Sequence, residues 1–232
     1  MRHGRLLRLL SVLMQLDLVF VPNATTGVNA VLRSLKFQPG AQLLTTNHEY
    51  NACRNALNYV AEREGLEVVV AEIPFPLTSS SQILEAVIDK ISSRTRLALL
   101  DHVTSQTGLV FPLAELIQEF NQRGIETLID GAHAPGMVPL NLRELDATYY
   151  SGNCHKWLCS PKGAAFLVVK RDLQPDIRPL TISHGANADR PNRIAAFTWN
   201  LTGWEPMTRQ PIYVFPQQFN GWILCYPAVG QK

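Results

Sequence analysis

Three polar segments of this sequence follow apolar runs, and their residue types could act together on a small molecule. The first reads Pro22-Asn23-Ala24-Thr25-Thr26-Gly27. Two hydroxyls and a glycine at the start of a helix, with free backbone N–H groups and the positive end of the helix dipole, suit a phosphate group. The alternative for Thr25 and Thr26 is an ordinary threonine N-cap, because Ser and Thr are preferred at that position.

The second segment is Leu128-Ile129-Asp130-Gly131-Ala132-His133, in which an acid ends an apolar run. A carboxylate at the end of a strand points into the crevice beside the sheet, where Asp130 could pair with a cationic ring nitrogen or a metal ion. Capping of the following turn is the alternative. His133 could donate a hydrogen bond to a ligand oxygen, or it could have a purely structural role.

The third segment places Lys156 between His155 and Trp157, directly after an apolar run. Burial lowers the pKa of a lysine amine and makes it a nucleophile able to form a Schiff base, whereas most lysines are exposed on the surface. Cys154 and Cys159 lie beside these residues, but no second ligand pair completes the four-coordination of a zinc site.

The composition favours a small-molecule site. The 232 residues carry a formal net charge of +2, which is too near balance for a nucleic-acid or anionic-lipid partner. Four cysteines do not make a disulfide scaffold in a chain of this length and favour a reduced, cytoplasmic setting. Arginines interrupt the apolar run at residues 1–18, which argues against a signal peptide, and the run is too short for a membrane span.

The elements that must position these residues alternate between short β-rich runs and amphipathic segments. This alternation predicts an α/β fold, with a mainly parallel sheet covered by helices on both faces and ligands bound at the carboxyl ends of the strands. No Gly-x-Gly-x-x-Gly fingerprint is present, which disfavours a dehydrogenase. The expected strands are 18–21, 42–45, 66–70, 97–101, 127–130, 147–150 and 165–169, and the expected helices are 27–35, 49–63, 81–91 and 113–122.

A phosphate cradle, an acid for a ring nitrogen and a lysine amine are the groups that pyridoxal 5'-phosphate (PLP) requires. With these motifs, residues 17–197 resemble the class V (cysteine desulfurase-like) PLP-dependent aminotransferases of fold type I, in particular the isopenicillin N epimerase-like branch. The resemblance implies that Lys156 carries the internal aldimine and moves the substrate's α-proton. It also implies that Asp130 pairs with the pyridinium nitrogen and that His133 contacts the phenolic oxygen of the ring.

The remaining cofactor contacts are also implied by the resemblance. Thr25 and Thr26 would hold the phosphate, with Asn153 and His155 near the same group, although a serine stands at the position of Asn153 in relatives with a Ser-x-His-Lys pattern. Tyr50 would stack on the ring, with His48 as the alternative. In the stretch 102–108, Ser105 would lie beside the ring, and Cys53 and Cys154 would be packing residues.

The resemblance also implies a domain organisation: a PLP-binding large domain with a seven-stranded type of sheet at 17–200, and aberrant segments at 1–16 and 201–232. If residues 204–216 and 225–232 are back-translated with permitted codons and the codons are read in another frame, the resulting amino-acid sequences can match those of family members. This predicts a frameshift near Gly203 and a missing small C-terminal domain.

The functional expectation is therefore epimerase, aminotransferase or lyase chemistry on an amino acid, impaired by truncation, in a family whose intact members are homodimers. A non-catalytic remnant or pseudogene product is the alternative. Within the enzymes, a cysteine desulfurase or selenocysteine lyase would need a nucleophilic cysteine on a C-terminal loop, and Cys225 lies in the aberrant tail.

Overall fold

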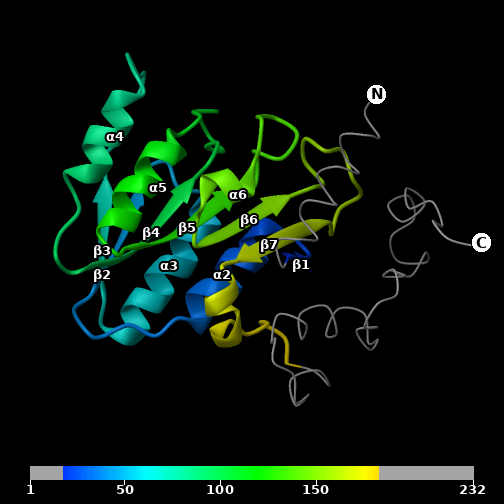
Figure 1. Ribbon diagram of the computed structural model, residues 1–232, viewed down its shortest axis with the longest axis horizontal. Helices are drawn as coiled ribbons and strands as arrows, with labels where there is room; N and C mark the ends of the chain where they lie inside the picture. Colours follow the sequence, from blue (N-terminus) through cyan, green and yellow to red (C-terminus); the bar gives the residue numbers. More distant parts are fainter. Residues whose placement is uncertain (1–17, 183–232) are drawn as a thin grey trace, which may run out of the picture.

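The computed structural model describes residues 18–182, and the expected aberrant segments 1–16 and 201–232 lie outside this range. Within it, the chain alternates between strands and helices (Figure 1). The strands are β1 (Leu18–Val21), β2 (Gln42–Thr46), β3 (Glu67–Ala71), β4 (Thr95–Asp101), β5 (Glu126–Gly131), β6 (Tyr149–Asn153) and β7 (Ala165–Val169). The helices are α2 (Ala24–Ser34), α3 (Asn51–Glu64), α4 (Ser81–Ile88), α5 (Leu113–Gln122), α6 (Leu142–Leu145) and the 3-10 helix η1 (Arg171–Asp176).

The seven strands form one sheet in the order β1-β7-β6-β5-β4-β2-β3. All neighbouring pairs from β6 to β3 are parallel, whereas β7 runs antiparallel to both β6 and β1. The prediction of a mainly parallel sheet is therefore confirmed. Parallel strands need crossover connections, and the helices between successive strands provide them.

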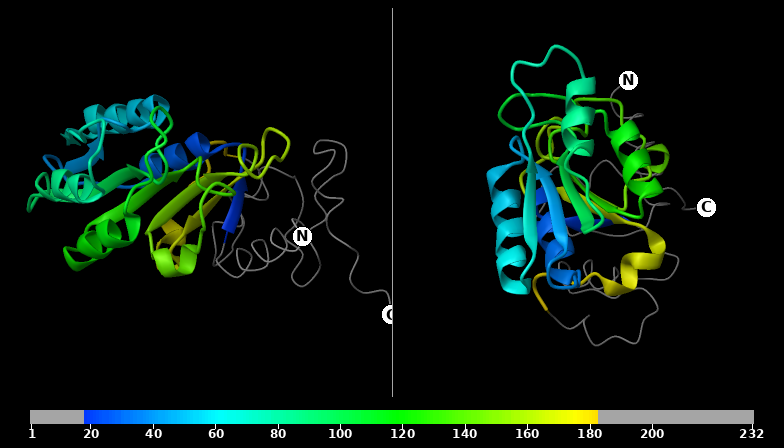
Figure 2. Two further views of the ribbon diagram at one scale, coloured as in Figure 1. Left: turned by 90° about the horizontal axis from the view of Figure 1, so that it is seen from above. Right: turned by 90° about the vertical axis from the view of Figure 1, so that its left-hand side faces the viewer.

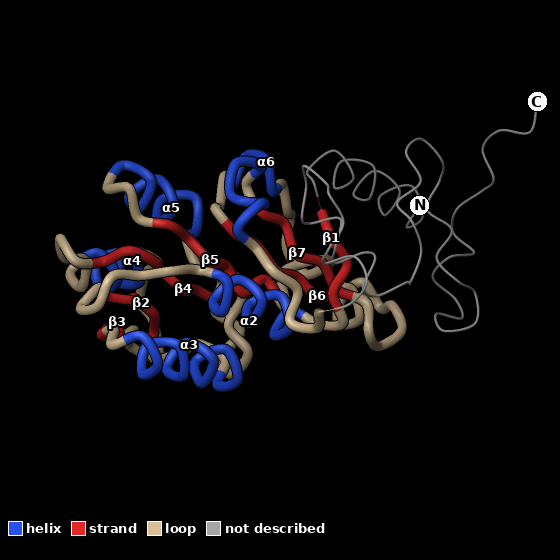
Figure 3. The backbone as a smooth tube through the Cα atoms, turned by 90° about the horizontal axis from the view of Figure 1, so that it is seen from below, coloured by secondary structure: helices blue, strands red, loops and turns tan. Residues whose placement is uncertain are grey.

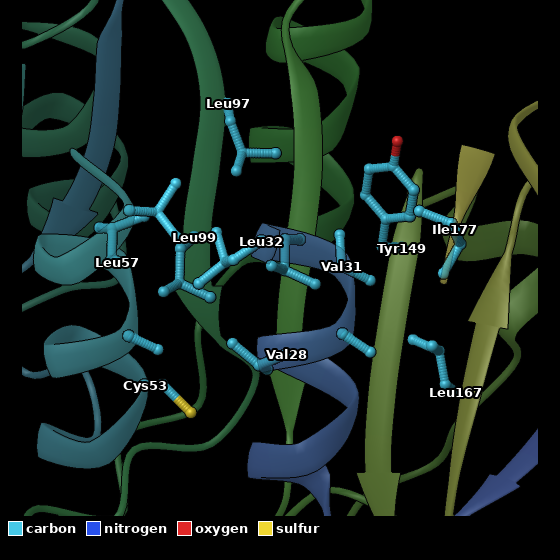
Figure 4. Close-up of a cluster of buried hydrophobic side chains, with 14 of the residues drawn as sticks. Val28, Val31, Leu32, Cys53, Leu57, Leu97, Leu99, Tyr149, Leu167 and Ile177 are labelled. Atoms are coloured by element: carbon cyan, nitrogen blue, oxygen red, sulfur yellow. The ribbon is translucent and has the colours of Figure 1, made fainter. Parts of the chain in front are cut away.

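Helices cover both faces of the sheet, with α2 and α3 on one side and α4, α5 and α6 on the other (Figures 2 and 3). Each face has its own apolar cluster. In the first, Val28 and Leu32 of α2 and Leu57 of α3 pack on strand residues such as Leu99 (Figure 4). Amphipathic periodicity was sufficient to predict these helices because one face of each is buried in this way.

The start of α2 differs from its prediction. The helix begins at Ala24, three residues before the expected start at Gly27, and its N-cap is Asn23. The Asn23 Oδ1 accepts the Thr26 N–H at 2.8 Å, so the threonine N-cap was wrong. Asparagine serves this position as well as threonine does. The two short helices α6 and η1 were not predicted, because they are too short to show a helical period.

The packing of α2 on β6 depends on Gly27, and Gly27→Ala is expected to destabilise the fold. A Cβ at this position would collide with the Ser151 side chain. Overpacking of this kind costs about 1 to 3 kcal/mol in the free energy of unfolding, which urea denaturation would measure. Adding Ser151→Gly should recover much of the loss, since it removes the colliding atoms. A double variant no more stable than Gly27→Ala would contradict this account.

Among the described residues 18–182, no helix combines the length and apolar character needed to cross a membrane.

Candidate active site

The parallel strands end at one edge of the sheet, and this edge carries the predicted site residues Asp130 and Lys156. Asp101 of β4 pairs in register with Asp130 of β5, and Asp130 pairs with Ser151 of β6. Lys156 follows β6, and in its protonated form it lowers the pKa of both aspartates. The structure therefore brings the predicted acid and the predicted amine together.

The amine of Lys156 is held against His133. Lys156 is half-buried, its Nζ lies 2.8 Å from His133 Nε2, and it lies 6.0 Å from the centre of the Tyr50 ring. Burial lowers the pKa of the Lys156 amine, and the negative charges of Asp130 and Asp101 oppose this shift. A lowered pKa increases the fraction of neutral amine, which is the nucleophilic form.

The hydrogen bonds of His133 also indicate a neutral amine. The indole Nε1–H of Trp157 donates to His133 Nδ1 at 3.3 Å. A neutral imidazole has one donor and one acceptor nitrogen, so Nε2 must then carry the proton and donate it. The partner of Nε2 is Lys156 Nζ, and an ammonium group cannot accept a hydrogen bond. Burial lowers the pKa of His133, which favours this neutral imidazole.

Asp130 is almost completely buried, with 1% of its surface exposed. Its Oδ1 accepts the Ala132 N–H at 2.9 Å, and its Oδ2 accepts the Cys53 Sγ–H at 3.0 Å. Burial raises the pKa of Asp130, whereas the two donors and the nearby Lys156 oppose this shift. Cys53 was expected only to pack, but its thiol is a direct partner of the predicted cofactor-binding acid.

The N-terminus of α2 is tied to β6. Asn153 Oδ1 accepts the Ala24 N–H at 2.8 Å, and the Ser151 hydroxyl donates to the Ala24 carbonyl at 3.1 Å. The Asn153 side chain thus caps the first turn of the helix. Thr25 and Thr26 are half-buried in that turn, and the Thr26 hydroxyl donates to Asn23 Oδ1 at 3.0 Å.

The other residues of the predicted set occupy different surroundings. Tyr50 is 40% exposed at the mouth of the site, whereas His48 is buried. Both ring nitrogens of His48 are engaged, Nδ1 with the Thr107 hydroxyl at 3.0 Å and Nε2 with the Ile73 carbonyl at 3.3 Å. Ser105 is exposed in the loop after β4. His155 Nδ1 contacts the Ala164 carbonyl at 2.9 Å, which places this ring beside the start of β7.

Two further acids were missed. Glu49 is 4% exposed, and neither of its carboxyl oxygens has a hydrogen-bond partner. Asp101 is also buried, and its Oδ2 has no hydrogen-bond partner either. Burial raises the pKa of both carboxyls; the charges of Asp101 and Asp130 reinforce the shift of Glu49, and the charge of Asp130 reinforces that of Asp101. Asp101 could have been found, since it ends an apolar strand as Asp130 does. Glu49 gives no such signal in the sequence, because a turn separates it from the end of β2.

These acids leave buried negative charge with little compensation. One carboxyl oxygen of Glu49, the Sγ of Cys53 and one carboxyl oxygen of Asp130 lie within 4.8 Å of one another. In its protonated form, Lys156 is a cationic side chain that acts on Asp101 and Asp130, and Arg54 acts on Glu49. A site of this kind favours a ligand that brings positive charge to Asp130.

Glu49→Gln is expected to stabilise the cofactor-free protein by an amount that grows with pH. A carboxyl with a raised pKa contributes most to stability below its unfolded-state value, here 4.5, and loses that contribution as pH rises through the folded-state value. The gain should reach about 1 to 3 kcal/mol by pH 8, because each unit by which burial raises the pKa of a carboxyl is worth about 1.4 kcal/mol. Urea denaturation from pH 5 to 8 measures it, with the exposed Glu115→Gln as the matched control. A stability difference independent of pH would contradict the buried-charge account.

A separate open cavity of about 410 Å³ lies at the amino ends of the strands. Its lining includes Lys36, Arg94, Arg96 and Glu126. It is at the edge of the sheet opposite Lys156 and Asp130, and Arg94 is already paired with Glu67. The chemistry-bearing residues therefore lie outside this cavity.

Comparison with known proteins agrees with this geometry. The family model described as aminotransferase class-V matches residues 6–204. The chain belongs to this family. The resemblance inferred from the sequence motifs is thereby confirmed, including its fold class.

Several relatives define the branch. Isopenicillin N epimerase of Streptomyces clavuligerus is 37% identical over 168 residues, which are 72% of this chain and 42% of the epimerase. A putative L-cysteine desulfhydrase of Oryza sativa is 32% identical over 170 residues, covering 67% of this chain and 35% of that protein. This chain thus spans less than half the length of these relatives.

A solved structure shares the fold. It is a lysine-to-alanine variant of C-DES with glycine covalently linked to its PLP cofactor. The TM-score is 0.66 at 26% sequence identity, and the match covers 72% of this chain and 44% of C-DES. A match of this extent confirms the α/β fold predicted from the alternation of strands and helices.

Proposed function

We propose that this protein is a PLP-dependent enzyme acting on an amino acid, with Lys156 as its catalytic residue. The observation that carries the proposal is the position of Lys156, whose Nζ lies 2.8 Å from His133 Nε2 in the same site as the buried carboxylate of Asp130. A nucleophilic amine beside an acid suited to a ring nitrogen is what an aldehyde cofactor on a pyridine ring needs.

The residues present fit PLP. Asp130 would hold the ring nitrogen, Thr25 and Thr26 at the helix N-terminus would hold the phosphate, and His133 would face the phenolic oxygen. The charged ring nitrogen would compensate the buried acids, which otherwise have unpartnered oxygens at Glu49 and Asp101. When bound, the cofactor supplies an electron sink for the bonds at the substrate's α-carbon.

Residues around the proposed cofactor site would provide further contacts to the ring and the phosphate. Tyr50 is the better stacking residue, because its ring is exposed near Lys156 Nζ whereas both nitrogens of His48 are engaged. Ser105, Asn153 and His155 would complete the surroundings of the ring and phosphate. Asn153 would act on the phosphate indirectly, by fixing the first turn of α2.

Lys156 would also move the proton of the reaction. A neutral amine can take the α-proton of an amino acid and return it as an acid, and a pKa lowered toward working pH makes both steps efficient. The hydrogen bond from His133 orients the amine for this role.

The reaction class follows from the relatives as a proposal. Epimerase, aminotransferase or lyase chemistry each begins with loss of the α-proton. Desulfhydrase relatives and the C-DES fold favour elimination from a sulfur-containing amino acid as a second candidate. We further propose residues 17–200 as the large domain of a cytoplasmic protein that works as a homodimer.

The experiment is α-proton exchange. The full chain with PLP is incubated in deuterated buffer with L-amino acids, and loss of the α-proton is followed by NMR together with release of sulfide and pyruvate. The proposal predicts exchange that Lys156→Ala eliminates, with Lys162→Ala, an exposed lysine, as the matched control. Exchange equal in the wild type and Lys156→Ala contradicts the proposal, and a lack of exchange with every amino acid supports the non-catalytic alternative.

A further inference from the structure

The thiol of Cys53 contacts Asp130, the acid that the proposed cofactor chemistry needs for the ring nitrogen. Cys53 is fully buried in the first turns of α3, in the layer between that helix and the sheet (Figure 4). Its Sγ–H points at Asp130 Oδ2 across a distance of 3.0 Å, although the two residues are far apart in the sequence.

The two oxygens of Asp130 are used in different ways. Oδ1 accepts the backbone N–H of Ala132, and this contact sets the carboxylate relative to its own strand. Oδ2 accepts from Cys53, and this contact sets it relative to α3. With donors from two elements, the carboxylate plane has one orientation. Removing the thiol leaves rotation about the Cβ–Cγ bond restrained on one side only.

The thiol also decides where the negative charge resides. Asp130 has two hydrogen-bond donors, whereas neither oxygen of Glu49 has one. Hydrogen bonds to a carboxylate favour its charged form. In a cluster of buried acids that share little positive charge, the proton therefore goes to Glu49 and the charge stays on Asp130. The groups that face Asp130 are Glu49, Cys53, Asp101, His133, Tyr150 and Lys156.

We propose that Cys53 is a positioning residue, whose thiol orients the Asp130 carboxylate and keeps it charged so that it can pair with a cationic ring nitrogen. This inference rests on the proposed function, because the ring belongs to PLP. Cys53 itself does not touch the reacting atoms. Cys154 is a suitable comparison, since it is a buried cysteine too, but burial alone accounts for the shift of its pKa.

The first test needs no cofactor. The S–H stretching band of a thiol moves to lower wavenumber when it donates to a strong acceptor such as a carboxylate. We expect infrared spectra of the cofactor-free full chain to show such a band, which disappears in Cys53→Ser and moves to higher wavenumber in Asp130→Asn. A Cys53 band that Asp130→Asn leaves in place overturns the proposal.

The second test measures PLP binding by titration. Cys53→Ala should raise the dissociation constant of PLP about fivefold to tenfold, as expected for loss of one hydrogen bond from a thiol, which is a weak donor. Cys53→Ser keeps a donor and should stay within about threefold of the wild type, as should Cys154→Ala. Thermal unfolding identifies a variant that fails to fold, in which case Cys53→Ser and the infrared arm decide. Equal affinity for PLP in Cys53→Ala and Cys53→Ser overturns the positioning role.

Failure of the proposed function has a different signature. In that case Lys156→Ala would bind PLP with the same visible band as the wild type, whichever residue stands at position 53. The infrared result would be independent of that outcome, because it reports the contact between Cys53 and Asp130 in the cofactor-free protein.

Discussion

Lys156→Ala is expected to abolish the visible absorption band of lysine-bound PLP and to reduce turnover to background. Among residues 18–182, the amine is the group in this site that can form the C=N bond to the cofactor aldehyde and also carry the α-proton, so no described neighbour replaces it. His133, its partner at 2.8 Å, cannot form that bond as an imidazole. Titration of purified protein with PLP, followed by absorbance, measures the change.

The control for this prediction is another lysine of the same region. Lys162 is exposed in the loop between β6 and β7, and Lys162→Ala should leave the band unchanged. Circular dichroism of both variants should match the wild type, since Lys156 is only half-buried. A band of full intensity in Lys156→Ala would show that another amine holds the cofactor.

Asp130→Asn is expected to weaken PLP binding by about 30-fold or more. The substitution preserves shape but removes the negative charge that would pair with the ring nitrogen, and truncating a buried charge pair costs about 2 kcal/mol or more. The cofactor-free variant should be at least as stable as the wild type at pH 8, because it lacks one of the mutually repelling buried acids. Spectroscopic titration and urea denaturation measure the two effects.

Glu126 offers a matched control at the other end of β5. Its carboxylate is partly buried and accepts from the Tyr149 hydroxyl at 3.0 Å. Glu126→Gln changes the same type of group in the same strand, but at the edge opposite the site. PLP affinity should not respond to it. If Asp130→Asn and Glu126→Gln had the same affinity for PLP, the role assigned to Asp130 would be contradicted.

The sequence predicted the site residues best where they stand directly after an apolar strand. Asp130 ends an apolar strand and Lys156 follows the next one, so a parallel sheet necessarily brings them to one edge. Every predicted strand and helix is present because alternation and amphipathic periodicity reflect burial on both faces. The aminotransferase class-V match and the epimerase relatives agree with this interpretation.

Contacts across the fold could not be predicted in the same way. Cys53 meets Asp130 only because the first turn of α3 reaches the end of β5, and no spacing in the sequence encodes that contact. The contact of Asn153 with the Ala24 amide likewise depends on how β6 lies against α2, whereas the cap by Asn23 is a contact within the first turn of the helix. For His48, the two partners come from segments after β3 and β4, which the local motif does not reveal.

The central claim is that the Lys156 amine is the site of cofactor attachment. The direct measurement is to incubate the full chain with PLP, reduce it with sodium borohydride, and locate the modified lysine by peptide mass spectrometry. Reduction fixes the lysine–cofactor bond, so a cofactor mass on Lys156 in nearly stoichiometric amount is the predicted result. Label spread over exposed lysines such as Lys90 and Lys162, with none preferred, would contradict it.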